Sequence, residues 1–157
     1  MSKFYNEIAE KYDFIFPLSP AHQTFFADEL QGHTVLDVGA ATGNLTAYLN
    51  SQGYEVTAID LSERLIAKAA EKGITVQQRN MLTIDELSTF DNIVCIGNTL
   101  PHLDSKASIQ LFLQKAYGQL TQEGKLVLQL VNFEKYFAQQ QGDYIEARKL
   151  VLFLTFT

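Results

Sequence analysis

The stretch TVLDVGAATGN, residues 34–44, decides the fold of this chain. Its first five residues, TVLDV, are mainly apolar or β-branched, which predicts a short buried strand. The turn 39–43 has glycine at both ends, and a helix over 44–52 is expected after it, with Gly53 at its end. A strand that enters a helix through such a turn opens a strand–helix–strand unit.

The same alternation of strand and helix repeats along the rest of the chain. Apolar runs between glycine or polar residues predict strands, and apolar residues at helical spacing predict helices. This order predicts an α/β fold with a three-layer, doubly wound, mainly parallel sheet. The expected strands are 34–38, 55–60, 74–79, 91–96 and 125–131, the last after a turn at Gly124. The expected helices are 5–16, 20–30 with Ser19 as cap, 44–52, one capped by Ser62 and one capped by Asp104 or Ser105.

The composition limits the class of protein. The 157 residues carry 12 Lys and Arg against 18 Asp and Glu, a formal net charge of −6, and 46% are apolar, which predicts one globular domain. The acidic balance argues against broad binding of nucleic acid or anionic membranes, because like charges repel. Cys95 is the single cysteine, so an intramolecular disulfide is excluded and a cytoplasmic location is favoured. We expect no secretory signal and no membrane span.

The last ten residues, RKLVLFLTFT, are rich in apolar and β-forming side chains. An unpaired strand of this composition is an aggregation hazard. We therefore expect residues 148–157 either to pair within the fold or to mark a chain that once continued.

Ligands of doubly wound sheets bind at the carboxyl ends of the strands, where the strand order reverses. At the first strand end, Gly39 permits a tight turn, while Ala40 and Ala41 keep side chains small beside a ligand. The dinucleotide fingerprint requires glycine at two positions where this chain has Ala41 and Asn44. A nicotinamide-dependent oxidoreductase is therefore a weak interpretation.

Further strand ends supply candidate ligand-binding side chains. Asp60 ends the second strand, where a carboxylate can bind both hydroxyls of a ribose, and the alternative is that it caps the next helix. Asn80 and Met81 could contact an adenine, or they are a polar strand end and a core methionine. His102, in the polar segment after the fourth strand, is either a site residue or a structural histidine.

Four segments, VLDVGAATG (35–43), VTAIDLSERLIAKA (56–69), RNML (79–82) and FDNIVCIGNTLPHL (90–103), resemble in order and spacing the class I S-adenosylmethionine-dependent methyltransferases. CIGNTLPHL looks like the corresponding segment of small-molecule N-methyltransferases, the glycine N-methyltransferase-like group in particular. FYNEIAEKYDFIF (4–16) resembles the helix that precedes the core in many of these enzymes. The resemblance covers residues 1–135 and implies a Rossmann-like methyltransferase fold with S-adenosylmethionine as cofactor.

The resemblance also implies roles for single residues in cofactor binding. The turn 39–43 would pass under the methionine part of the cofactor, and Asp60 would hold the ribose hydroxyls. Leu61, Asn80 and Met81 would contact the adenine. The implied cofactor-binding residues are Tyr12, Asp37, Gly39, Ala40, Ala41, Thr42, Gly43, Asp60, Leu61, Asn80, Met81, Ile96, Gly97, Thr99 and His102.

The segment after the fourth strand is implied to serve the reacting end of the cofactor. Ile96 and Gly97 would lie near the sulfonium, and Thr99 and His102 would help to fix the amino acid end. Asn98 would face the methyl acceptor, so that Asn98 and His102 are the implied catalytic residues. We expect no metal site.

The implied function is transfer of the S-adenosylmethionine methyl group to a small-molecule acceptor, an amine, by direct displacement at the sulfonium. A non-catalytic S-adenosylmethionine-binding module or fragment is the alternative from another functional class. The implied organisation is N-terminal helices over 1–33 that cap the site, a cofactor-binding α/β core over 34–135, and a truncated C-terminal strand region over 136–157 whose antiparallel strands are incomplete. A homodimer could form through the C-terminal strand, whereas neither nucleic acid nor a membrane is an expected partner.

Overall fold

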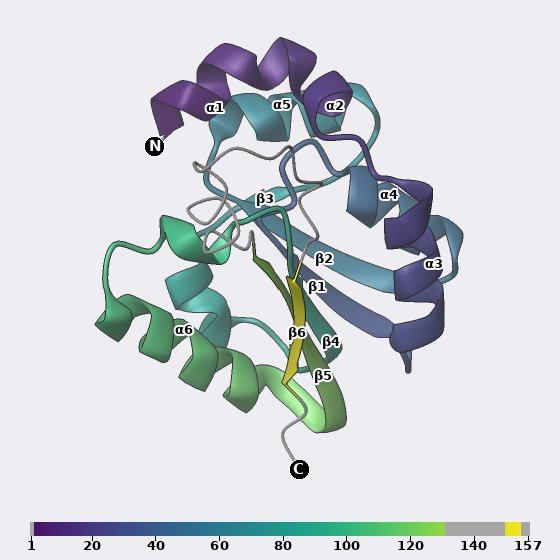
Figure 1. Ribbon diagram of the computed structural model, residues 1–157, viewed down its shortest axis with the longest axis vertical. Coiled ribbons are helices and arrows are strands. Elements are labelled where there is room, and N and C mark those ends of the chain that lie inside the picture. Colours follow the sequence, from purple (N-terminus) through teal and green to yellow (C-terminus); the bar gives the residue numbers. More distant parts are fainter. Residues whose placement is uncertain (1, 131–149, 155–157) are drawn as a thin grey trace, which may run out of the picture.

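The computed structural model describes residues 2–130 and 150–154 of the chain. Its strands form one sheet in the order β3-β2-β1-β4-β5-β6 (Figure 1). Every pairing from β3 to β5 is parallel, and β6 pairs with β5 in the antiparallel direction. The strand order reverses beside β1, as in doubly wound folds, so the predicted mainly parallel α/β architecture is confirmed. The strands are β1 Thr34–Val38, β2 Glu55–Asp60, β3 Gln77–Gln78, β4 Phe90–Cys95, β5 Leu120–Leu130 and β6 Leu150–Leu154.

Helices cover both faces of the sheet, and alternate residues of each strand face opposite cores. On one face, Leu36 and Cys95 pack with Phe112 of α6. On the other face, the neighbouring strand residues Val35 and Val94 pack with helices α3 and α4. The helices are α1 Ser2–Ile8, η1 Ala9–Lys11, α2 Tyr12–Ile15, α3 Pro20–Glu29, α4 Asn44–Ser51, α5 Glu63–Glu71, η2 Met81–Glu86, η3 Leu100–His102 and α6 Lys106–Gln119.

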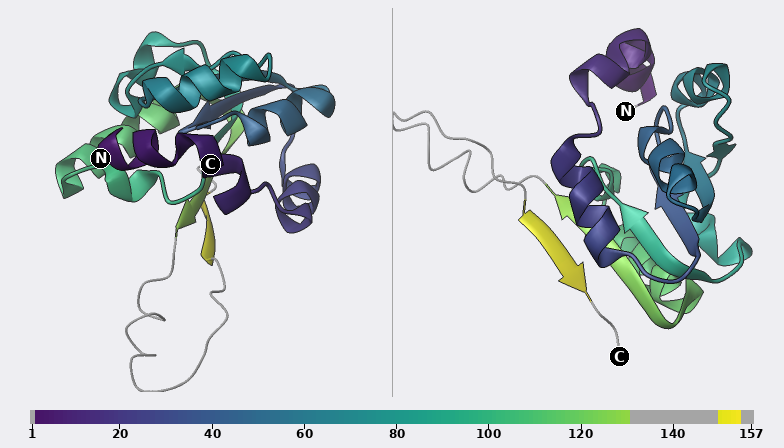
Figure 2. Two further views of the ribbon diagram at one scale, coloured as in Figure 1. Left: turned by 90° about the horizontal axis from the view of Figure 1, so that it is seen from above. Right: turned by 90° about the vertical axis from the view of Figure 1, so that its right-hand side faces the viewer.

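The predicted helix caps agree with the structure. Ser19 and Ser62 cap α3 and α5, and Ser105 rather than Asp104 caps α6 through a bond from Ser108 N to Ser105 Oγ. A hydroxyl at this position satisfies a backbone N–H that has no partner inside the helix. The expected helix 5–16 consists of three joined segments, α1, η1 and α2, at the top of the molecule in Figure 1, and α1 and η1 lie against α5 (Figure 2).

Two strand predictions are wrong in their extent. The expected strand 74–79 is reduced to Gln77–Gln78, because Ile74 and Val76 pack into an apolar cluster with α5 instead. The fifth strand begins at Leu120, directly after α6, so Gly124 lies inside β5 and forms no turn between helix and strand. The register between β4 and β5 is irregular at this point: Phe90 pairs with Leu120, but Asn92 pairs with Lys125. The additional residues of β5 therefore have no paired residue in β4.

The C-terminal segment supplies one strand, as expected. Leu150–Leu154 pairs antiparallel with β5, in the register Leu126↔Leu154 to Leu130↔Leu150. The rest of the expected strand region 136–157 lies outside the described residues, and the homodimer through this strand stays a prediction. Within the described residues, no helix is long and apolar enough to cross a membrane.

Candidate functional site

A cavity of about 340 Å³ lies at the carboxyl ends of β1, β2 and β4. Its volume falls within the range of about 300–1,000 Å³ that is usual for small-molecule sites. Leu61, Met81 and Leu103 give it apolar walls, and Asp60 and Asn80 supply polar groups. The sequence-predicted site residues that line it are Tyr12, Gly39, Ala41, Asp60, Leu61, Asn80, Met81, Gly97, Thr99 and His102. The remaining lining residues, which were not predicted as site residues, are Tyr5, Val38, Ile59, Ser62, Leu65, Arg79, Leu82, Leu103 and Asp104.

Other predicted site residues do not line this cavity. Asp37 is buried beneath it, and Thr42 is buried in the turn. Ile96 lines a second cavity on the α3 face of the sheet. Asn98 follows Gly97 and has a left-handed backbone with φ of 65°. The predicted residues outside the first cavity are Asp37, Ala40, Thr42, Gly43, Ile96 and Asn98, and their roles toward cofactor or acceptor stay predictions.

Asp60 holds two backbone segments while it faces the cavity. Its Oδ2 accepts a hydrogen bond from Ala41 N at 2.9 Å, and its Oδ1 accepts one from Ser62 N at 2.8 Å. Ser62, and not Asp60, is the cap of α5. Each carboxylate oxygen can accept more than one hydrogen bond, so Asp60 can still accept bonds from a ligand.

The turn 39–43 has a positive φ at Gly39, Ala41 and Gly43, and the first two of these residues line the cavity. Gly39 has φ of 77°, and a Cβ there would lie 2.5 Å from the side chain of Thr99, so no larger residue fits. Ala41 has φ of 51°, which is strained for a residue with a side chain. The bond from Ala41 N to Asp60 holds this conformation and keeps the turn against the cavity.

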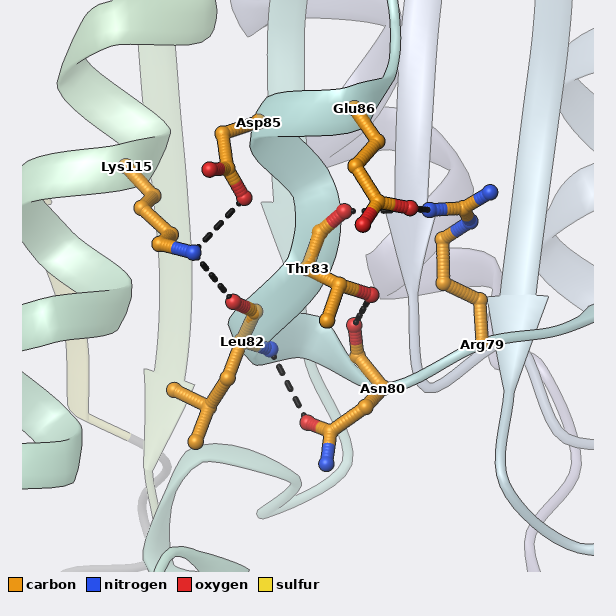
Figure 3. A network of polar contacts seen from close by, with 7 residues as sticks. All are labelled: Arg79, Asn80, Leu82, Thr83, Asp85, Glu86 and Lys115. Atoms are coloured by element: carbon orange, nitrogen blue, oxygen red, sulfur yellow. Dashed lines mark hydrogen bonds and ion pairs between the residues drawn. The ribbon is translucent and has the colours of Figure 1, made fainter.

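A polar network holds residues 79–86, which follow β3 and contribute one wall of the cavity (Figure 3). Asn80 Oδ1 accepts a bond from Leu82 N at 2.9 Å and so caps η2. Lys115 donates to Leu82 O at 2.6 Å and to Asp85 at 2.7 Å. Arg79 donates to Glu86 at 2.6 Å. Lys115 of α6 therefore anchors this segment from outside, while Arg79 and Asn80 form their bonds within it.

Tyr5 and His102 form a pair on the cavity wall. The Tyr5 hydroxyl lies 2.7 Å from His102 Nε2, and the two rings meet edge to face with centroids 5.4 Å apart. Burial lowers the pKa of His102, although the Asp60 carboxylate acts in the opposite direction. Burial, with a smaller effect of Asp60, raises the pKa of Tyr5. Both groups are therefore neutral at neutral pH, so the pair shares a hydrogen bond without a net charge.

Asp13, which the sequence did not single out, joins the N-terminal segment to the turn. Its carboxylate accepts bonds from the Thr42 hydroxyl, from Asn44 Nδ2 at 2.9 Å and from Lys72 Nζ at 2.8 Å. Although burial acts to raise it, the pKa of Asp13 is lowered by the bonds from Lys72 and Thr42. We call these contacts the Asp13 latch. They hold residues 2–15 over a cavity that Tyr5 and Tyr12 line.

Asp37 is buried under the turn, and its burial raises its pKa from 3.8 to about 6, although Thr46 Oγ1 donates to Asp37 Oδ2 at 2.7 Å. Between about pH 4 and pH 6, the folded protein therefore keeps a proton that the unfolded chain has already lost. The free energy of unfolding falls as the pH rises through this range. Asp37→Asn should remove this loss and raise the free energy of unfolding at pH 7.5 by up to roughly 3 kcal/mol.

Urea unfolding of both proteins at pH 4.5 and pH 7.5 measures this effect. The difference between the two proteins should be larger at pH 7.5. An equal difference at both pH values would show that Asp37 does not titrate in this way.

Comparison with known proteins agrees with this geometry. The family described as "Methyltransferase domain" matches residues 35–124. The glycine/sarcosine N-methyltransferase of Halorhodospira halochloris is 33% identical over 121 residues, 70% of this chain and 45% of that protein. The glycine/sarcosine/dimethylglycine N-methyltransferase of Actinopolyspora halophila is 26% identical over 149 residues, 85% of this chain and 26% of that protein. The chain belongs to the class I S-adenosylmethionine-dependent methyltransferase family.

The fold is shared with solved structures. An S-adenosylmethionine-dependent methyltransferase from Clostridium acetobutylicum superposes with a TM-score of 0.70 at 21% identity, over 90% of this chain and 63% of that chain. The first curated relatives are longer than this chain, which spans from 26% to 56% of their length. The matched part runs from Val35, within β1, to beyond β4 and contains the cavity residues that follow these strands.

Proposed function

We propose that this chain binds S-adenosylmethionine in the first cavity and transfers its methyl group to a small-molecule amine. The observation that carries the proposal is the meeting of the turn 39–43, the Asp60 carboxylate and the Asn80 amide on one cavity. An amine acceptor is supported by relatives that are named as glycine/sarcosine N-methyltransferases. We also propose that the protein works in the cytoplasm and on no nucleic acid, since its single cysteine cannot form an internal disulfide and its net charge is −6.

The residues present fit this cofactor. Asp60 can accept hydrogen bonds from both ribose hydroxyls while it keeps its backbone bonds. Leu61, whose side chain is exposed beside the cavity, and Met81 supply apolar surfaces for a flat adenine ring. Asn80 uses its oxygen to cap η2, so its amide nitrogen is the group that would donate to a ring nitrogen.

When bound, the cofactor supplies a methyl group that is already activated by the sulfonium. The protein then has to align the acceptor lone pair with this methyl group, and correct alignment alone can lower the barrier by about 7–11 kcal/mol. The rings of Tyr5 and Tyr12, 6.4 Å apart on the cavity wall, offer aromatic surfaces to a cation. Asp60 adds negative charge on the same wall.

An amine that accepts a methyl group has to lose a proton. His102 is neutral at neutral pH and lines the cavity, so its imidazole can take that proton at Nδ1 when its Nε2–H donates to the Tyr5 hydroxyl. The Tyr5 hydroxyl orients the ring through Nε2. Burial raises the pKa of Tyr12, and so its phenol stays neutral and serves packing rather than proton transfer.

The test of this proposal is thermal unfolding with S-adenosylhomocysteine and, separately, with NAD. A ligand that binds only the folded state stabilises it by RT ln(1 + [L]/Kd), so S-adenosylhomocysteine should raise the Tm and NAD should not. A shift with NAD alone would overturn the assignment in favour of an oxidoreductase. Mass spectrometry of a panel of amines then separates an enzyme from a non-catalytic binding module, which would bind without methylating any of them.

Asn98 is the candidate acceptor contact. Asn98→Ala should lower kcat at least about tenfold and change the Kd for S-adenosylhomocysteine less than twofold, because Asn98 lies outside the first cavity. Asn98 has a positive φ, so Asn98→Gly serves as a second variant that keeps this backbone without strain. Steady-state kinetics and calorimetry measure the two effects. A loss of cofactor affinity with unchanged kcat would remove Asn98 from the acceptor side.

A further inference from the structure

A second cavity, of about 270 Å³, lies on the α3 face of the sheet, at the ends of β4 and β5. It is built from an aromatic and aliphatic wall with a small number of polar groups, which is the usual composition of a small-molecule site. Phe25 and Phe26 meet edge to face with ring centroids 5.3 Å apart. The residues that line it are Ser19, Ala21, His22, Phe25, Phe26, Ile96, Val127 and Gln129.

The linings of the two cavities include consecutive residues just after β4. Ile96 lines the second cavity, and the next residue, Gly97, lines the first. Gly97 has φ of 70°, and a Cβ at this position would have no heavy atom within 4 Å. The step from Ile96 to Gly97 therefore separates the two linings, and the space beside Gly97 is open.

The buried side-chain amide of Gln129 connects the linings of the two cavities. Gln129, only 6% exposed, accepts a hydrogen bond from Gly97 N at 3.0 Å through Oε1, and its amide nitrogen lies 3.2 Å from His22 Nε2. An amide nitrogen has two hydrogens, so Gln129 can donate a second bond into the cavity. A ligand in the second cavity would therefore contact the Gln129 amide, which also accepts the hydrogen bond from Gly97 N.

Among the described residues, no Lys, Arg, Asp or Glu lines the second cavity. An ammonium group placed there would lose its water and meet no carboxylate among these residues, which is costly, and a carboxylate would meet only the His22 imidazole and the polar groups of Ser19 and Gln129. Aromatic walls instead favour a flat apolar group. The described part of the lining thus favours an uncharged, aromatic occupant.

We propose that the second cavity holds the body of the methyl acceptor, an uncharged and preferably aromatic group, while its amine reaches past Gly97 into the first cavity. This inference rests on the proposed function and specifies its substrate class. It separates this chain from relatives named for glycine and sarcosine, whose substrates carry a carboxylate close to the amine. An arylalkylamine matches the proposed class, whereas a small amino acid does not.

Two fluorinated amines test the proposal by ¹⁹F NMR, with and without S-adenosylhomocysteine. 4-Fluorobenzylamine has an uncharged body, and 4-(aminomethyl)-3-fluorobenzoate has the same amine on a body with a carboxylate. Ala21→Leu places a larger side chain at the rim of the second cavity. Ala27→Leu is the matched control, because Ala27 is also exposed on α3 but does not line the cavity.

The wild-type protein and Ala27→Leu should bind 4-fluorobenzylamine at least about tenfold more tightly than the carboxylated probe. Ala21→Leu should weaken 4-fluorobenzylamine binding at least about fivefold and leave the Kd for S-adenosylhomocysteine within twofold. Equal affinity for the two probes, no binding of 4-fluorobenzylamine, or equal behaviour of the two leucine variants would overturn the inference. Failure of S-adenosylhomocysteine to bind would instead overturn the proposed function. The titration of 4-fluorobenzylamine without S-adenosylhomocysteine would still compare the affinities of the two leucine variants.

Discussion

Asp60→Ala should weaken binding of S-adenosylhomocysteine at least about tenfold. The substitution removes the carboxylate that would accept charge-assisted hydrogen bonds from two ribose hydroxyls, each worth about 1.5–3 kcal/mol. It also removes the acceptor for Ala41 N, which holds the left-handed turn beside the cavity. Both losses act in the same direction, and isothermal titration calorimetry measures their sum.

A second variant separates the two contributions of Asp60. Asp60→Asn keeps an oxygen that can accept the bond from Ala41 N or Ser62 N, but it loses the charge. Its affinity should lie between the affinities of the wild-type protein and Asp60→Ala. Asp28→Ala, at an exposed carboxylate on α3 that does not line the cavity, is the control and should bind as the wild-type protein does. Unchanged affinity in a folded Asp60→Ala protein would remove Asp60 from the cofactor site.

Asp13→Ala should increase the dissociation rate of S-adenosylhomocysteine at least about fivefold. The latch gives Asp13 three hydrogen-bond donors, from the turn, from the first residue of α4 and from the residue after α5, and these hold residues 2–15 over the cavity. Its side chain is 47% exposed, so water weakens the ion pair with Lys72, and the latch contributes about 1 kcal/mol, which corresponds to the fivefold change. Stopped-flow displacement of the bound ligand measures the rate.

Glu10→Ala is the matched control for the latch. Glu10 belongs to the same N-terminal segment and forms an ion pair with Lys68 of α5 at 2.7 Å, but it has no bond to the turn. Its loss should leave the dissociation rate within twofold. The lowered pKa of Asp13 means that the latch is charged at neutral pH and weakens only as the pH falls below about 4. A rate increase of equal size in both variants would show that any loosening of the segment suffices.

The sheet was predictable where local signals and burial agree. In residues 34–52, the strand, the glycine turn and the helix each have their own signal, and the structure has all three within one residue of the expected bounds. The prediction of a strand over 74–79 was wrong because Ile74 and Val76 are apolar for another reason, namely their contact with α5. An apolar pattern reports burial, and burial does not require hydrogen bonds to a neighbouring strand.

The site was predictable in the residues that follow strand ends, because the topology alone brings these to one edge. Asp60, Asn80 and Gly97 meet on the first cavity for this reason. Tyr5 and Asp13 were not singled out, because their partners lie far along the chain: His102 is 97 residues from Tyr5, and Lys72 is 59 residues from Asp13. No local pattern encodes such a contact.

The burial of Cys95 has a practical consequence for following the N-terminal segment. Cys95 is the single cysteine of the chain, it is fully buried, and burial with the nearby charge of Asp37 raises its pKa to about 12. Such a thiol stays protonated and unreactive toward alkylating dyes. Phe14→Cys, at a position whose side chain is 89% exposed, would therefore accept a fluorophore at one defined place without removal of the native thiol. An introduced surface cysteine can therefore be labelled at a single site while the native Cys95 stays in place.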